Sequence, residues 1–364
     1  RTYPNFCRLL AELGVESVPT GMGFSVSSEA YDFEYCGSGL GGMFAQRRNL
    51  VRPGHYRMIR DILKFNRIAT GLSGQTGDES QTVNEFLSVH GLSKEFGDRY
   101  LLPMGAAIWS CPPAVFGQFP VRFIAEFYRN HGLLSLTNRP TWRVVQGGSR
   151  EYIRRLTASF QDRILLNTPV RSVERTGAGV RISTDLDFAL FDEVVLACHT
   201  DQALQMLGSH ANESERYLLK VIPYNSNRAT LHTDTSVLPR RRRVWSSWKH
   251  RLADRPGCAS LTYNMNVLQH LQSEHTFCVT LNDAPKIHHE SIRGTYEYSH
   301  PVFTTERAVV RQRHHELIRN DRISCCGAWC GNGFHEDGVN SALRVAEAFQ
   351  TARHSRDAET SGNA

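Results

Sequence analysis

Residues 323–342 read ISCCGAWCGNGFHEDGVNSA, and the rest of the chain is organised around this stretch. The pattern predicts a short strand, a glycine-rich loop and then a helix. The helix is indicated by apolar residues at helical spacing, namely Val339, Ala342, Leu343, Ala346 and Phe349. Glu336 and Asp337 stand where acidic side chains favour a helix start.

Three glycines precede the predicted helix and let the backbone approach a ligand closely. The helix N-terminus adds unpaired N–H groups and a partial positive charge. Together these features suit a phosphate group, or the N1/C2=O edge of a flavin, which gains negative charge on reduction. The alternative is an ordinary strand–loop–helix connection, in which the glycines serve only the turn.

The segment from Cys326 to Ala342 resembles the C-terminal flavin-contacting motif of the flavin amine oxidase superfamily. More narrowly, it is similar to a bacterial branch of FAD-dependent, amine-oxidase-like proteins associated with cyclopropane fatty acid synthase. The resemblance implies that FAD is the cofactor and that it is contacted by Gly327, Ala328, Phe334, His335, Glu336, Asp337, Gly338 and Val339. One departure is Ala328, where many members carry an acidic residue that contacts the ribityl chain or a phosphate.

The same resemblance implies an α/β fold, α+β overall, with two domains. The expected FAD-binding domain is Rossmann-like and is assembled from the discontinuous segments 1–25, 140–222 and 318–350. The expected substrate domain, of antiparallel sheet and helices, is inserted between them as residues 26–139 and 223–317. The polar residues 351–364 are expected to form a disordered tail.

Two further positions in the expected FAD domain are assigned roles by the resemblance. Val170 is implied to offer its backbone to the adenine, and Ala197 is implied to let the chain pass close to the cofactor. Strand patterns support this region, because residues 170–175 and 180–184 predict a hairpin and residues 192–197 predict a buried strand.

The chain opens on Arg1, and in the family a similar segment follows the strand–GxGxxG–helix unit that cradles the FAD diphosphate. We therefore expect an N-terminally truncated member that lacks this unit. A literal GxGxxG does occur at residues 37–42. It is not expected to be the fingerprint, since residues 31–35 alternate instead of forming the continuous apolar run of a buried parallel strand.

The composition is that of a globular cytoplasmic protein. The 364 residues suffice for two domains, and the net charge of +6 is mild. There is no run of about 18 apolar residues, so no transmembrane helix is expected. The nine cysteines include no CxxC, which indicates buried thiols in a reducing compartment. No metal site is predicted, because no histidine pair has zinc-ligand spacing.

An aromatic-rich block within residues 101–131 is the expected substrate region. Plain core packing explains each phenylalanine taken alone. As a group, the aromatic and sulfur-containing side chains are candidates to line an apolar tunnel, and we select Met104, Trp109, Phe119, Phe123 and, from further along the chain, Trp245.

The arginine run 240–243 stands just before Trp245. It indicates a solvated basic loop. A peripheral contact with an anionic lipid, or with the headgroup of an acyl carrier, is one alternative. Nucleic acid is the other, and no recognised DNA or RNA motif supports it.

The predicted function is that of an FAD-dependent oxidoreductase that oxidises or desaturates an apolar, fatty acyl substrate, with a functional link to cyclopropane fatty acid synthase. The alternatives are an FAD-dependent amine oxidase, a carotenoid-type flavin desaturase or isomerase, and a non-catalytic lipid-binding subunit. The catalytic residue stays unassigned. Lys220 and Lys249 are the lysines in plausible regions, but neither lies in a diagnostic motif.

Overall fold

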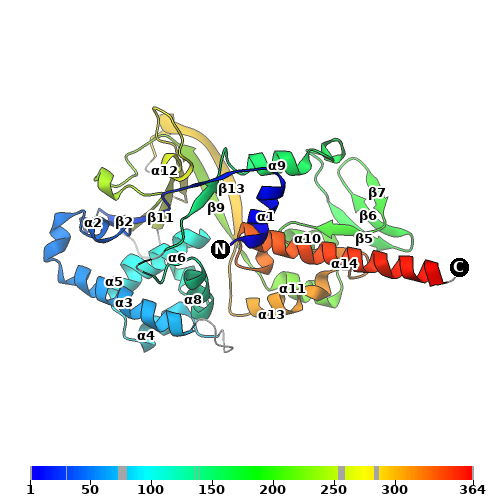
Figure 1. The fold of residues 1–364 in the computed structure, drawn as a ribbon, viewed down its shortest axis with the longest axis horizontal. Coiled ribbons are helices and arrows are strands. Elements are labelled where there is room, and N and C mark those ends of the chain that lie inside the picture. The colour runs from blue at the N-terminus through cyan, green and yellow to red at the C-terminus, as the bar shows by residue number, and fades with distance from the viewer. Residues whose placement is uncertain are drawn as a thin grey trace. The chain divides into compact units, whose positions relative to one another are not determined.

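The computed structural model describes residues 2–29, 31–72, 80–135, 137, 139–252, 259–282 and 287–362. The chain divides into two compact units, whose elements are labelled in Figure 1. Unit 1 comprises Arg1–Gly14, Tyr152–Pro223 and Glu306–Ala364. Unit 2 comprises Val15–Glu151 and Tyr224–Thr305.

The observed boundaries between the two domains differ from the predicted ones at four places. Residues 15–25 and 140–151 belong to unit 2, and residues 223 and 306–317 belong to unit 1. The first difference has a physical cause, because β1 (Ser17–Pro19) pairs with β4 (Arg143–Val145) inside unit 2. Such a pairing across more than a hundred residues leaves no local signal in the sequence.

Unit 1 contains two small sheets. In the first, β8 (Val194–Leu196) and β14 (Ile323–Cys325) run parallel. The second is an antiparallel meander of β5 (Ser172–Thr176), β6 (Gly179–Ser183) and β7 (Phe188–Phe191), drawn in green in Figure 1. The predicted hairpin and the predicted buried strand are therefore confirmed.

The last helix of unit 1 in the chain is the one that the apolar spacing from Val339 to Phe349 predicts. The helices of this unit are α1 (Pro4–Glu12), α10 (Thr200–Leu207), α11 (Glu213–Lys220), α13 (Arg307–Arg313) and α14 (His335–Gly362), with α9 (Arg150–Thr157) beginning at the unit boundary. Short 3₁₀ turns are Gln161–Arg163, Gly208–His210, His314–Leu317 and Ala328–Cys330. The prediction of a disordered tail from residue 351 was wrong as far as Gly362, because α14 continues to that residue.

The start of α11 shows how the sequence specifies a boundary. Asn212 Oδ1 accepts a hydrogen bond from Glu215 N, and the Glu215 carboxylate accepts one from Asn212 N, both at 2.9 Å. This reciprocal pair is a capping box, which satisfies backbone donors that a helix end leaves without partners.

Asn212→Ala is therefore expected to lower the free energy of unfolding by about 1 kcal/mol, since the helix loses its cap. Urea denaturation measures the change. Gln202→Ala, on the exposed surface of α10, is the matched control and should leave the stability nearly unchanged. Equal stabilities of Asn212→Ala and the wild-type chain would contradict the capping role.

Unit 2 is built on a mixed seven-stranded sheet of order β13-β9-β12-β11-β10-β2-β3. Its strands are β2 (Phe24–Ser28), β3 (Phe33–Cys36), β9 (Tyr224–His232), β10 (Trp248–Leu252), β11 (Ala259–Asn264), β12 (Cys278–Leu281) and β13 (Ile292–Pro301). Neighbouring strands are antiparallel except β2 and β10, which are parallel.

The helices of unit 2 include the aromatic-rich block. They are α2 (Leu40–Met43), α3 (Pro53–Leu72), α4 (Val83–Val89), α5 (Lys94–Phe96), α6 (Leu102–Trp109), α7 (Pro113–Phe116), α8 (Val121–Asn130) and α12 (Met265–Gln269), with a π-helical segment at Gly97–Leu101 and 3₁₀ turns at Arg47–Val51, Arg242–Val244 and His289–Ser291. The GxGxxG of residues 37–42 follows β3, an antiparallel strand at the sheet edge, so its context is not that of a dinucleotide fingerprint.

The two faces of this sheet differ in chemistry. One face carries the apolar core residues Ala229, Leu261 and Leu281, which pack with Ala107 of α6. The other carries a row of directly opposed polar residues, because side chains opposite one another on neighbouring strands share a face. The row runs through Ser25, Lys249, Thr262, Thr280 and Thr230, all of them buried.

No helix among the described residues is both long and apolar enough to cross a bilayer.

Candidate functional site

The predicted cofactor loop lies at the carboxyl ends of two parallel strands of unit 1. Leu196 of β8 is opposite Cys325 of β14, and Cys326 N donates to Leu196 O at 3.1 Å. Ala197 and Gly327 therefore follow neighbouring strands at one edge of the sheet. Trp329 Nε1 closes the loop by donating to the backbone oxygen of Cys198 at 3.1 Å. Ligands bind outside the carboxyl ends of strands in open parallel sheets.

Two of the loop glycines are required by the packing of the protein itself. A Cβ at Gly327 would lie 2.3 Å from Trp329 Nε1, and a Cβ at Gly331 would lie 2.0 Å from Asp337 Oδ1. Both distances are far shorter than a van der Waals contact. These glycines are therefore explained without a ligand.

Gly338, in the first turn of α14, is different. The protein atoms nearest to a Cβ built there are the Cβ and N of Ala328, both at 4.0 Å. The protein therefore leaves room beside Gly338, and its packing alone does not call for a glycine. An open cradle next to a helix N-terminus, whose first N–H groups have no intrahelical acceptor, fits an anionic or polar edge of a cofactor.

The predicted contact residue Glu336 has other partners. Its carboxylate accepts hydrogen bonds from Asn5 N at 3.1 Å and from Phe6 N at 2.8 Å, in the first turn of α1. Each carboxylate oxygen accepts one of these bonds, so Glu336 caps the start of α1, and its predicted contact with the cofactor stays a prediction. Asp337 likewise serves the loop, since Oδ2 accepts from Phe334 N at 3.0 Å. Burial raises the pKa of the Asp337 carboxyl above its usual range.

Three predicted residues remain. The His335 ring stacks on Phe6, with centroids 4.7 Å apart. Val339 directly follows Gly338 in α14. Val170 precedes β5 and so belongs to the antiparallel meander rather than to the β8–β14 pair.

The open space beside Gly338, in the first turn of α14, fits a polar edge of FAD. The residues that would hold it are Ala197, Ala328 and Gly338, through backbone and small side chains, together with the N–H groups at the start of α14. The cofactor roles of the other predicted residues stay predictions.

The predicted substrate residues lie in unit 2, where four of the five gather in the aromatic block. Met104, Trp109, Phe119 and Phe123 are buried. The Trp109 ring centroid lies 5.3 Å from that of Phe123 and 5.8 Å from that of Phe119. Trp245 lies in the loop of the arginine run and not in the aromatic block. Its Nε1 donates to Pro239 O at 2.8 Å and its ring lies under Arg242, so its role in holding this loop accounts for the tryptophan.

An open pocket of about 450 Å³ lies beside this block, within the size range of ligand pockets. Its lining combines apolar and polar residues, namely Ala114, Val115, Phe119, Val302 and Phe303 with Thr82, Gln118, Thr304 and Thr305. The Thr304 hydroxyl oxygen is buried and has no hydrogen-bond partner among the described residues. Leaving a buried hydroxyl unpaired costs free energy, so this atom is a candidate contact for a bound polar group. The sequence analysis did not identify Thr304, because the residues next to it in the sequence form no motif and its pocket neighbours include residues far away in the chain.

Lys249 is the second residue whose environment the sequence could not reveal. It is only 3% exposed, and the carboxylates of Glu29 and Glu34 act on it electrostatically. Burial, followed by the nearby Arg251, lowers the pKa of Lys249 to about 7. A lysine that is partly neutral near pH 7 can accept a proton. Lys220, the other candidate, is exposed.

Comparisons with known proteins agree with this fold. No curated protein sequence matches the chain. Among solved structures, cyclohexylamine oxidase from Brevibacterium oxydans IH-35A has 13% identity and a TM-score of 0.63, with 96% of this chain and 86% of that chain covered. A CLA-producing fatty acid isomerase from P. acnes has 13% identity and a TM-score of 0.64, with 95% and 84% covered. Putrescine oxidase bound to putrescine has 13% identity and a TM-score of 0.61, with 95% and 85% covered.

At this level of identity the solved structures establish the fold alone. The family is established by sequence, because the model described as flavin containing amine oxidoreductase matches residues 1–254, more than half of the chain. This match lies outside residues 326–342, and it confirms the superfamily that the resemblance of those residues implied. The chain belongs to the flavin-containing amine oxidoreductase family and is an FAD-dependent oxidoreductase.

Proposed function

We propose that this oxidoreductase acts on an apolar, fatty acyl substrate, which it oxidises or desaturates. The observation that carries the proposal is the pocket of unit 2, where Ala114, Val115 and Val302 offer apolar surface, the buried Phe119 and Phe303 complete the lining, and Thr304 has an unpaired buried hydroxyl. Such a lining favours a long apolar chain that ends in a single polar group. Cytoplasmic action and a functional link to cyclopropane fatty acid synthase stay parts of this proposal.

FAD, when bound, supplies the redox chemistry by accepting two electrons from the substrate. The pocket residues of this chain bind and orient the substrate. Phe119 and Phe303, both buried, exclude water from the acyl chain. The Thr304 hydroxyl donates to an oxygen of the polar end, which fixes the position of the chain along the pocket.

Amine oxidation is the second candidate, and two of the similar solved structures are amine oxidases by name. An ammonium substrate calls for an acidic side chain or an aromatic cage. No acidic residue lines the pocket in the part of the chain that the structure describes, while Phe119 and Phe303 do line it. The missing acidic anchor places the acyl substrate first and keeps the amine as the second candidate. A desaturase or isomerase acting on a carotenoid-type chain would suit the same apolar surface.

The test is anaerobic reduction of the FAD-loaded protein, followed as bleaching of the visible flavin absorbance. We expect a long-chain unsaturated fatty acid to bleach the flavin, and putrescine and cyclohexylamine to leave it oxidised. Bleaching by the amines alone would overturn the proposal in favour of amine oxidation.

Thr304→Val is expected to raise the dissociation constant of the fatty acid about fivefold, since one hydrogen bond is lost and the side-chain shape is kept. Titration of the flavin spectrum with the fatty acid measures this change. The matched control is Thr305→Val, which changes the same residue type in the same pocket lining and should leave the constant nearly unchanged. An equal effect of both substitutions would argue against a specific contact at Thr304.

A further inference from the structure

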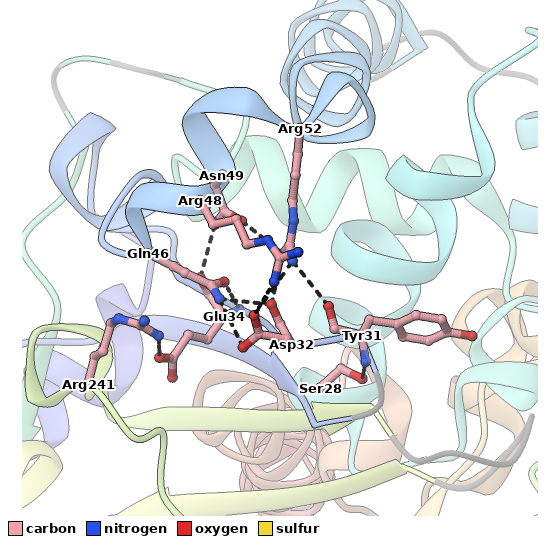
Figure 2. Close-up of polar contacts among 9 residues, drawn as sticks. All are labelled: Ser28, Tyr31, Asp32, Glu34, Gln46, Arg48, Asn49, Arg52 and Arg241. Carbon is pink, nitrogen blue, oxygen red and sulfur yellow. Dashed lines mark hydrogen bonds and ion pairs between the residues drawn. The ribbon is translucent and has the colours of Figure 1, made fainter.

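The β2–β3 hairpin of unit 2 carries a polar cluster that the redox function does not use (Figure 2). Its centre is Glu34, which is buried. The Glu34 N–H donates to Gln46 Oε1 at 2.9 Å, and its backbone oxygen accepts from Asn49 Nδ2 at 3.1 Å. Its carboxylate pairs with Arg241. One buried residue, Glu34, thus holds both the segment around Arg47–Val51, through its backbone, and the arginine run, through its carboxylate.

Asp32 forms the second centre of this cluster. Arg48 Nη1 lies 3.1 Å from Asp32 Oδ2, and Arg52 Nη1 donates to the Asp32 backbone oxygen at 2.8 Å. Figure 2 shows both guanidinium groups turned toward Asp32. Burial, and then the charge of Arg48, lower the pKa of Arg52, which indicates that cations are crowded here.

Positive charge outweighs negative charge in this cluster. Seven arginines face three acidic residues: Arg47, Arg48, Arg52 and Arg240–Arg243 against Glu29, Asp32 and Glu34. All of the arginines but Arg52 are exposed. Asp32 and Glu34 are occupied by Arg48, Arg52 and Arg241. The exposed guanidinium groups of Arg47, Arg242 and Arg243 are therefore available to anions in solution.

Large apolar side chains are exposed on the segments that carry this cluster, namely the β2–β3 turn, α2 and the Arg47–Val51 turn. Val51 is 78% exposed, Leu40 is 75% exposed and Tyr31 is 63% exposed. Leu50, 52% exposed, is tied in place because its backbone oxygen accepts from Tyr56 Oη at 2.9 Å. Single exposed apolar residues are common on soluble proteins, but a group of them rimmed by charge marks an interaction surface.

We propose that this surface, made of Tyr31, Leu40, Arg47, Arg48, Leu50, Val51 and Arg240–Arg243, docks on the anionic face of a lipid bilayer. The arginines bind headgroup phosphates, for which the planar guanidinium is well suited. The aliphatic side chains enter the boundary between headgroups and acyl chains. A nucleic acid offers the phosphates but gives no gain for Leu40 or Val51, so the composition of the surface favours the bilayer.

Sedimentation of the full chain with vesicles tests this proposal. We expect binding to vesicles of phosphatidylcholine with phosphatidylglycerol, and little binding to phosphatidylcholine alone. Arg47→Gln with Arg243→Gln is expected to weaken binding roughly twentyfold, since each arginine near an anionic surface contributes about 1 kcal/mol. The binding should also weaken as salt is added, because the charges are exposed to solvent.

The aliphatic contribution is tested by Leu40→Ser with Val51→Ser, which should weaken binding to the same vesicles at least severalfold. The matched controls replace exposed residues of unit 1, Arg163→Gln and Leu186→Ser, and should bind like the wild-type chain. Circular dichroism confirms that each variant is folded.

Absence of binding to anionic vesicles would overturn the proposal. Equal weakening of vesicle binding by the surface variants and by the unit 1 controls would also overturn it. Binding to duplex DNA as strong as to the vesicles, and insensitive to Leu40→Ser with Val51→Ser, would replace it with a general polyanion site. None of these outcomes depends on the identity of the redox substrate.

Discussion

Gly338→Val is expected to weaken FAD binding about tenfold or more while the chain stays folded. The space beside Gly338 holds no protein atom closer than 4.0 Å to a built Cβ. A Cβ fits there without displacing Ala328, and the larger valine side chain would occupy the room that a cofactor edge needs. Overpacking of a close contact costs about 1–3 kcal/mol, which corresponds to this loss of affinity.

Titration of the purified protein with FAD, followed by flavin fluorescence, measures the affinity, and circular dichroism measures the folded state. Ala346→Val places the same side chain two turns further along α14, on an exposed position, and is the matched control. Unchanged FAD affinity in Gly338→Val would show that the start of α14 does not lie against the cofactor.

The strand, loop and helix around Gly338 could be predicted from the sequence because their signals are local. Apolar spacing identifies a helix whatever its surroundings, and the acidic residues before it mark the start. The roles of those acids could not be predicted. Glu336 accepts hydrogen bonds from Asn5 and Phe6, more than three hundred residues away, so one of the two acids that favour the start of α14 also caps α1.

The sequence also does not reveal which distant residues surround a given side chain. Trp245 was grouped with the aromatic block by residue type, yet it packs in the loop that carries the arginine run. Thr304 and Lys249 carried no motif. Their significance comes from what surrounds them, namely a pocket in one case and a buried row of opposed strand residues in the other. Composition and periodicity do not encode such long-range neighbours.

Lys249→Met is expected to raise the free energy of unfolding by about 3 kcal/mol near pH 6, an unusual gain for a single substitution. Lys249 stands between Ser25 and Thr262 on the polar face of the sheet, and it is buried. The nearby carboxylates of Glu29 and Glu34 raise its pKa, but burial outweighs them. Methionine keeps the length of the side chain and removes the charge that burial penalises.

The pH dependence distinguishes this explanation from a simple packing effect. The pKa of Lys249 is about 7 in the folded chain, against 10.5 for an ordinary lysine. Below pH 7 both the folded and unfolded forms carry the proton, and the folded form bears the full cost of the buried charge. Between the two pKa values the unfolded chain binds the proton and the folded chain does not, so wild-type stability rises with pH across this window.

The advantage of Lys249→Met should therefore shrink steadily from pH 7 and nearly vanish above about pH 10.5. Urea denaturation of both proteins across this range measures it, with Lys220→Met as the control because Lys220 is exposed and should give no such trend. A stability difference that does not change with pH would mean that the Lys249 ammonium is already compensated. The same curve would locate the pH above which Lys249 is neutral in the folded chain and can accept a proton.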